Sequence, residues 1–267
     1  MKAVKLIAIA VAVLAIIVGL LLLTGNNTGT VDPGVKNQTM LNLKSQILAE
    51  WNQADNWDAA LLDKHLDKIE QNKNALSNGY QTLIDLTAEV ACHRLDSITM
   101  SEFAKPDCNH ALINAYHQNV THLVAKVPSY ENNEQIKKLK ATIALYNKAR
   151  NLIGRTFACN PQFDFTTDQW KTFANYRSSI LQERNNIRQS TYYQNIQNIN
   201  EITTGLSKVE NRIETAKETY KTNLSNQIIA AYSPSDPALK DRLQAVYGRY
   251  KQELGTNQAL KSFVENY

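Results

Sequence analysis

Hydrophobic residues recur at alternating three- and four-residue steps along most of the chain, which is the period of an α-helix that buries one face. Six segments show this pattern: about 42–54, 57–98, 107–127, 136–153, 169–232 and 238–254, with a short tail helix from Gln258. The six prolines fall between these segments. The pattern predicts an all-α protein, an elongated antiparallel helical bundle with coiled-coil-like seams.

The boundaries of the helices are marked by short polar residues and proline. Asn56 is the expected N-cap of the helix from about Trp57 to Ile98, in which Gly79 weakens the middle without interrupting the seam. Asp107, just after Pro106, is the expected N-cap of the next helix. The sequence predicts a main bundle over 42–232 and C-terminal helices over 233–267 that pack on it or extend it.

The segment 169–232 contains no proline and leaves two interpretations open. An unbroken helix of this length would extend about 95 Å. The heptad phase slips, however, in the Asn- and Gln-rich stretch "RNNIRQSTYYQNIQNINEITTG", and such a slip loosens a coiled coil locally. The segment is therefore either one long helix with a weak middle or two shorter helices.

The N-terminus carries an uninterrupted apolar run from Leu6 to Leu23, preceded by Lys2 and Lys5. As a helix this run would rise about 27 Å, close to the thickness of the hydrocarbon core of a bilayer. The exit "LLLLTGNN" lacks the Ala-x-Ala of a cleavage site, which favours an uncleaved anchor over a cleaved signal peptide. The positive-inside rule then predicts a cytoplasmic N-terminus (1–5), a single membrane span (6–23), a linker (24–41) and an exported remainder, periplasmic or extracellular.

Composition and charge add little to this picture. The chain has 267 residues and a net charge of +4 that is spread along it, so no nucleic-acid partner is expected. Lys171, Arg177, Arg184 and Arg188 form a loose basic stripe on one predicted helix, which is either solvated surface or a contact for an acidic partner.

Reactive side chains gather between Ala91 and His122, which holds two of the three cysteines and four of the five histidines. The histidines of the helix after Pro106 are spaced seven and five residues apart, so none form a metal-binding pair within one turn. Glu89, His93 and Asp96 do share one helix face. They could hold a transition metal if another helix supplied ligands, or they could form a solvated polar face.

The three cysteines allow several arrangements. In an exported hairpin Cys92 and Cys108 would lie near one end, so a disulfide between them is the favoured prediction, with Cys159 as an alternative partner. Together with His93 and His110, the three thiols could instead form a three-Cys, one-His zinc site, although no Cys-x-x-Cys pair is present. They could also be three separate buried thiols. Cys108 is placed at a helix N-terminus, which lowers a thiol pKa, but no base for catalysis accompanies it.

No motif for nucleotide binding, hydrolase, metalloprotease, haem or di-iron chemistry occurs in the chain. The sequence therefore predicts a non-enzymatic, membrane-anchored extracytoplasmic protein without a cofactor, a structural or protein-interaction module of the cell envelope that binds a protein partner or itself through its helices. The alternative is a sensory or ligand-binding helical domain, for a small molecule or metal, with its pocket near the cysteines. An enzyme is the least favoured interpretation, because only the Cys/His cluster supports it.

Overall fold

The computed structural model describes residues 33–76, 78–164, 169–232 and 238–267. The predicted cytoplasmic N-terminus (1–5) and membrane span (6–23) lie outside the described residues. Within the described ranges, no helix combines the length and the apolarity needed to cross a membrane. Helix α2 begins at residue 33, within the range predicted as a linker (24–41).

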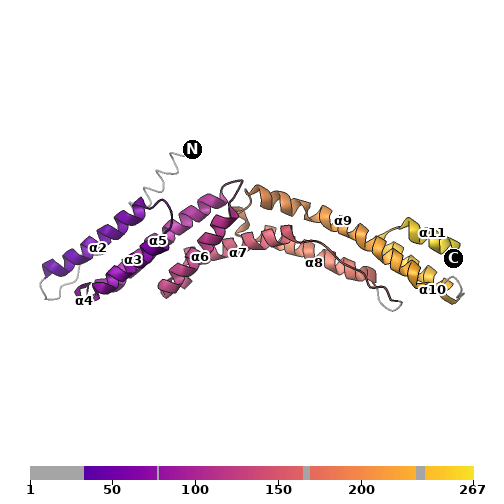
Figure 1. Ribbon diagram of the computed structural model, residues 1–267, viewed down its shortest axis with the longest axis horizontal. Coiled ribbons are helices and arrows are strands. Elements are labelled where there is room, and N and C mark those ends of the chain that lie inside the picture. Colours follow the sequence, from indigo (N-terminus) through magenta and orange to yellow (C-terminus); the bar gives the residue numbers. More distant parts are fainter. Residues whose placement is uncertain (1–32, 77, 165–168, 233–237) are drawn as a thin grey trace.

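The described part of the chain is all-helical and contains no strand, which confirms the predicted class. Its elements are α2 (Pro33–Gln53), α3 (Ala59–Gln71), α4 (Lys73–Leu76), α5 (Gly79–Phe103), α6 (His110–Lys126), the 3-10 turn η1 (Pro128–Asn132), α7 (Glu134–Gly154), α8 (Gln169–Gln189), the 3-10 turn η2 (Tyr193–Asn195), α9 (Asn200–Ala231), α10 (Ala238–Leu254) and α11 (Gln258–Asn266). Figure 1 shows these helices arranged as a long, arched rod.

The rod contains two hydrophobic cores in series. The N-terminal core gathers buried residues of α2 to α7, and the C-terminal core gathers buried residues of α5 to α11. Helices α5, α6 and α7 contribute to both cores: on α7, for example, Ile136 belongs to the N-terminal core and Ile143 to the C-terminal core. These three helices therefore join the two halves of the rod through continuous packing.

The predicted single helix from Trp57 to Ile98 is wrong, because the chain reverses there. Asn72 ends α3, where its side-chain amide donates to the Lys68 carbonyl at 2.8 Å. The indole of Trp57 then donates to the Ala91 carbonyl at 2.9 Å, so the two arms of the segment run antiparallel. Gly79 opens the second arm at a point where a Cβ would lie 2.7 Å from the sulfur of Met40 on α2. Asp58, not Asn56, caps α3.

The segment 169–232 forms two helices, α8 and α9, so the interpretation with a break is correct. The intervening turn is packed: Ile196 and Ile199 are buried in the C-terminal core. The first residue of α9 is also tied to the rest of the rod, since the Asn200 N–H donates to the Pro106 carbonyl at 2.9 Å. The hydroxyl of Tyr220, in the second half of α9, donates to the carbonyl of Gln169 at the start of α8, so the two helices run antiparallel.

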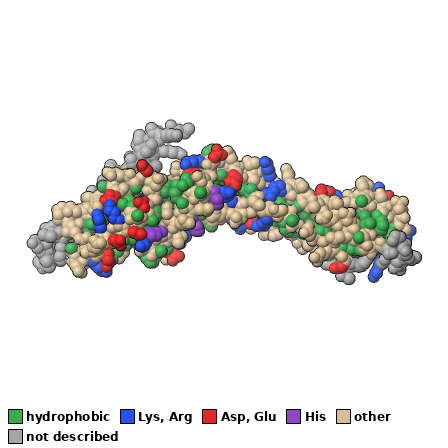
Figure 2. Space-filling view, viewed as in Figure 1, with side chains coloured by type: hydrophobic (Ala, Val, Ile, Leu, Met, Phe, Trp, Pro, Cys, Tyr) green, Lys and Arg blue, Asp and Glu red, His purple; other side chains and the backbone are tan. Residues whose placement is uncertain are grey.

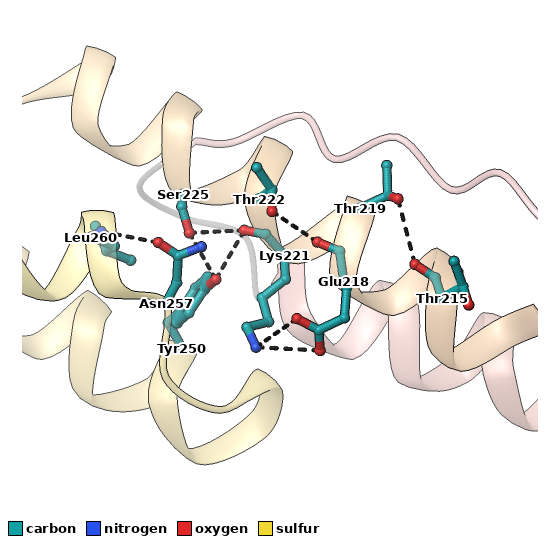
Figure 3. Close-up of polar contacts among 9 residues, drawn as sticks. All are labelled: Thr215, Glu218, Thr219, Lys221, Thr222, Ser225, Tyr250, Asn257 and Leu260. Atoms are coloured by element: carbon teal, nitrogen blue, oxygen red, sulfur yellow. Dashed lines mark hydrogen bonds and ion pairs between the residues drawn. The ribbon is translucent and has the colours of Figure 1, made fainter. Parts of the chain in front are cut away.

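The two C-terminal helices follow the predicted boundaries and pack on α9. The hydroxyl of Tyr250 donates to the Lys221 carbonyl at 2.9 Å and lies 2.7 Å from the Ser225 hydroxyl (Figure 3). Gly255, at φ 84°, ends α10 in the left-handed conformation that glycine adopts without strain. Asn257 then caps α11 by accepting the Leu260 N–H at 3.1 Å.

Candidate functional site

The three cysteines are free thiols, and the structure contains no Cys92–Cys108 bridge. Cys92 lies in the N-terminal core, whereas Cys108 and Cys159 pack against the C-terminal core. The reason is the length of α5, which continues to Phe103 and so carries the chain about 16 Å beyond Cys92 before it turns. Cys92 is thus remote from the turn where Cys108 lies.

The thiols are also poor nucleophiles. Burial raises the pKa of Cys92 to about 12 and that of Cys108 to about 11. The expected lowering at the N-terminus of α6 is overcome at Cys108 by this burial, to which the nearby carboxylate of Glu102 adds. Both thiols therefore stay protonated at neutral pH, and the Cys/His cluster offers no activated nucleophile.

The predicted metal ligands do not converge. Among the residues that the structure describes, no group of three or more His, Cys, Asp or Glu side chains is placed to hold a metal ion. His93 lies 3.9 Å from Glu89, but its Nδ1 faces the amide of Gln135 on α7 at 3.0 Å, which is not a metal-binding group. Burial raises the pKa of Asp96, the third member of the row. His110 belongs to a different place on the rod.

His110 lines a polar pocket between α6 and α7, with a volume of about 410 Å³. The two helices are joined by η1 and run antiparallel, so the first turn of α6 lies beside the last turns of α7. The lining consists of His110 and Asn114 from α6 and of Asn147, Arg150 and Asn151 from α7. We refer to it below as the α6–α7 pocket.

The start of α6 is held firmly in place. The side chain of Asn109 caps the helix by accepting the N–H of Ala111 at 3.0 Å and that of Leu112 at 3.4 Å. The buried carboxylate of Glu102 accepts the N–H of Asn109 at 2.7 Å and pairs with Lys105. Burial alone would raise the pKa of Glu102, but these two contacts outweigh it and hold the pKa below its usual range.

Tyr146 contacts two of the pocket residues, His110 and Arg150. It is fully buried, and its ring packs against those of Phe103 and His110 at centroid distances of 5.4 Å and 5.8 Å. The guanidinium of Arg150 donates to the Tyr146 hydroxyl at 3.2 Å and lies 3.5 Å from the carboxylate of Glu201 on α9. Arg150 is therefore oriented from two sides.

Two polar atoms of the pocket residues are buried without a hydrogen-bond partner: Nδ1 of His110 and Oδ1 of Asn147. The amide nitrogen of Asn114 lies 3.1 Å from Nε2 of His110. If that amide donates, the neutral imidazole carries its proton on Nδ1, which then is a donor. Buried polar atoms without partners are rare in folded proteins, because each costs about 1–3 kcal/mol.

The sequence indicated only His110 among the pocket residues, because the pocket forms between two helices. The signal on α7 is the polar spacing Asn147, Arg150, Asn151, which places three hydrogen-bonding side chains on one face beside the seam. Such spacing is common on solvated helices, so it becomes informative only once α6 is known to lie against it.

Two arginines of the basic stripe predicted on α8 pair with acidic residues of α9. Arg177 binds Glu214 at 2.6 Å, and Arg184 binds Glu210 at 3.2 Å, both on α9. These two arginines join the antiparallel helices.

The chain matches no protein-family profile, no curated protein sequence and no solved structure.

Proposed function

We propose that the protein is a non-enzymatic helical rod that works on the outer side of a membrane as a structural or protein-interaction module, held there by the apolar segment 6–23. The observation that carries this proposal is the arrangement of two cores in series, joined by α5, α6 and α7. A rod of this construction keeps its two ends apart and presents long helical faces to a partner or to a second copy of the chain.

The surface of the rod supports contacts of a polar kind. Among the described residues, the large hydrophobic side chains that are exposed are Leu41 on α2 and Leu112 on α6. Figure 2 shows acidic and basic side chains interspersed along the face in view. A partner would therefore bind through charged and hydrogen-bonding groups around a few apolar contacts, as in non-obligate complexes.

A photo-crosslinking experiment in cells of the source organism tests this proposal. A photoreactive residue would replace Leu41 or Leu112, with Ala174, an exposed residue of α8, as the matched position away from both. We expect a discrete crosslinked species, from an envelope protein or a second copy, at one of the leucine positions. If all three positions give no discrete crosslink, the interaction proposal fails.

A second candidate function is the binding of a small molecule. The specific observation in its favour is the α6–α7 pocket, which is lined by a histidine, an arginine and three asparagines. Ligand sites in proteins usually have a volume of about 300–1,000 Å³ and contain a few convergent polar groups. The rod would then act as a receptor for a ligand as well as a spacer.

A further inference from the structure

We propose that Asn78 is a site of spontaneous chemical modification, in which its side-chain amide becomes a carboxylate through a ring closed by the backbone nitrogen of Gly79. The site lies in the turn that joins α4 to α5 and does not depend on the proposed function. Three observations carry it: the Asn-Gly pair, the hydrogen bonds of the turn and the packing of Gly79 against α2.

The chemistry needs only these two residues and water. The backbone nitrogen of Gly79 loses its proton to hydroxide and attacks the side-chain carbonyl carbon of Asn78. The C–N bond of the side chain then breaks, and the nitrogen leaves as ammonia. Water opens the resulting succinimide ring at either of its carbonyl groups, which gives aspartate or isoaspartate at position 78.

The identity of the following residue distinguishes Asn78 from the other asparagines. It is the one asparagine of the chain that is followed by glycine. Every other asparagine is followed by a residue with a side chain, which hinders closure of the ring. Glycine also has the backbone freedom that the ring requires. We therefore expect Asn78 to react first.

Neither reacting group has a hydrogen-bond partner among the residues that the structure describes. Asn78 is exposed and precedes α5, but its side chain makes no capping hydrogen bond. Gly79 is the first residue of α5, where the backbone N–H groups have no partner within the helix. By contrast, the side chains of three other capping asparagines each accept a backbone N–H: Asn109, Asn133 and Asn257.

The turn has to open before the ring can close. At φ −71° and ψ −13° the backbone of Asn78 is helical, and rotation about its Cα–C bond is needed to bring the Gly79 nitrogen to the side-chain carbonyl. On the other side of the turn, α4 has four residues, and so short a helix has little stability of its own. The rate of modification therefore reports how often the α4–α5 turn opens.

The two products differ in their effect on the fold. Aspartate at position 78 places a negative charge at the N-terminus of α5, which favours the helix. Isoaspartate adds a methylene group to the main chain and so displaces Gly79, where even a Cβ would lie 2.7 Å from the sulfur of Met40 on α2. The isoaspartate form should loosen the contact between α2 and α5.

Ageing of the full-length chain in detergent tests this inference. The protein would be incubated folded and in urea, at neutral and at mildly alkaline pH. Peptide mass spectrometry measures the conversion of each asparagine, and enzymatic methylation of its carboxylate measures isoaspartate. In the folded chain we expect Asn78 to convert first, and faster at the alkaline pH, while Asn109 stays intact over the same period. Conversion of Asn78 in urea alone, or no faster than that of Asn109, would overturn the proposal.

Matched variants identify the reacting groups. Asn78→Gln and Gly79→Ala should both lose the modification, whereas Asn74→Gln, at an exposed position of α4, should age as the parent chain does. The flexible side chain of Met40 can move away from an alanine at position 79, and circular dichroism melting verifies that each variant folds. Undiminished conversion of Asn78 in Gly79→Ala would overturn the ring mechanism.

Asn78→Asp separates the added charge from the lengthened main chain. This variant should melt no lower than the parent chain, and the isoaspartate fraction of the aged protein should melt below both. An isoaspartate fraction as stable as Asn78→Asp would contradict the predicted effect on the contact between α2 and α5.

Discussion

At the scale of single residues, the most unusual group is His65, a histidine buried in the N-terminal bundle at 2% exposure. Its Nε2 lies 3.4 Å from the carboxylate of Glu50 on α2, and that carboxylate is also bound by Lys64 at 2.7 Å. Burial lowers the pKa of His65 below 6.5, with Lys64 and Lys68 adding to the effect and Glu50 opposing it. The neutral imidazole is therefore the form that the fold accommodates.

This burial makes the stability of the N-terminal half depend on pH. Below pH 6.5 the unfolded chain binds a proton at His65 more readily than the folded chain does, so the free energy of unfolding falls as the pH drops from 6.5 toward the lowered pKa. Urea unfolding followed by tryptophan fluorescence, at about pH 7.5 and about pH 5.5, should show this loss. Trp51 and Trp57 report on this core directly.

The control for that experiment is a pair of histidine variants. His65→Leu removes the titrating group and should flatten the pH dependence, whereas His117→Gln, at an exposed position, should leave it unchanged. An equal pH dependence in the parent chain and the His65 variant would show that His65 is not the responsible group.

Glu102 is the second residue whose charge has a structural role. Glu102→Ala removes the acceptor of the Asn109 N–H and the partner of Lys105, and we expect a loss of about 1–3 kcal/mol in the free energy of unfolding. Glu102→Gln keeps an acceptor and should lose less. Because the pKa of Glu102 is lowered, its contribution is present above pH 4.5 and is lost as the pH falls below that value. Thermal melts at neutral pH should show the lowest melting temperature for Glu102→Ala and an intermediate one for Glu102→Gln. A Glu102→Ala variant as stable as the parent chain would contradict this structural role of Glu102.

At the scale of helices, Gly205 permits the close approach of α9 to α7. A Cβ at this position would lie 2.6–2.7 Å from three side-chain carbons of Ile153, so the whole isoleucine would have to move. On an exposed helix, replacing glycine by alanine stabilises by about 0.5–1 kcal/mol. At Gly205 we expect the sign to reverse, with a loss of about 1–3 kcal/mol from overpacking.

Gly248 on α10 provides the matched substitution, because a Cβ there meets nothing within 4 Å. Denaturant unfolding of Gly205→Ala and Gly248→Ala should therefore give opposite changes in midpoint. If Gly205→Ala also stabilises the protein, the packing of α7 on α9 is looser than described.

The helices themselves were largely predictable from the sequence, but the reversal between α3 and α5 was not. Ile69, Leu76 and Leu83 are spaced seven residues apart and all are buried, so the seam stays in phase across the turn. Periodicity reports which residues face the core and cannot tell one helix from two that face the same core. The break between α8 and α9 was more visible, because there the phase slips.

The residues of the α6–α7 pocket could be predicted from the sequence only in part. His110 was identified by residue type, but Asn147 and Arg150 resemble ordinary surface residues until the antiparallel packing of α6 on α7 brings them beside it. The length of α5, which continues past Cys92 to Phe103, likewise separates Cys92 from Cys108, which the sequence had placed together. In both cases the distance along a helix decides which side chains meet, and the position of the turn sets that distance.

At the scale of the whole molecule, the central claim is that the chain is a rod with two cores in series. Shared helices α5, α6 and α7 make the junction part of both cores, so the two halves are joined by packed side chains and not by a linker. This construction is what allows the proposed function as a spacer and interaction module, because a compact domain would not hold its ends apart.

Small-angle X-ray scattering of the chain from residue 33 tests this claim most directly. A compact protein of this length has a radius of gyration of about 18 Å. For the rod of Figure 1 we predict a value well above that, with a pair-distance distribution that rises early and extends in a long tail, at every concentration at which the protein is monomeric. A radius of gyration close to the compact value, with a symmetric distribution, would contradict the rod and with it the proposed function.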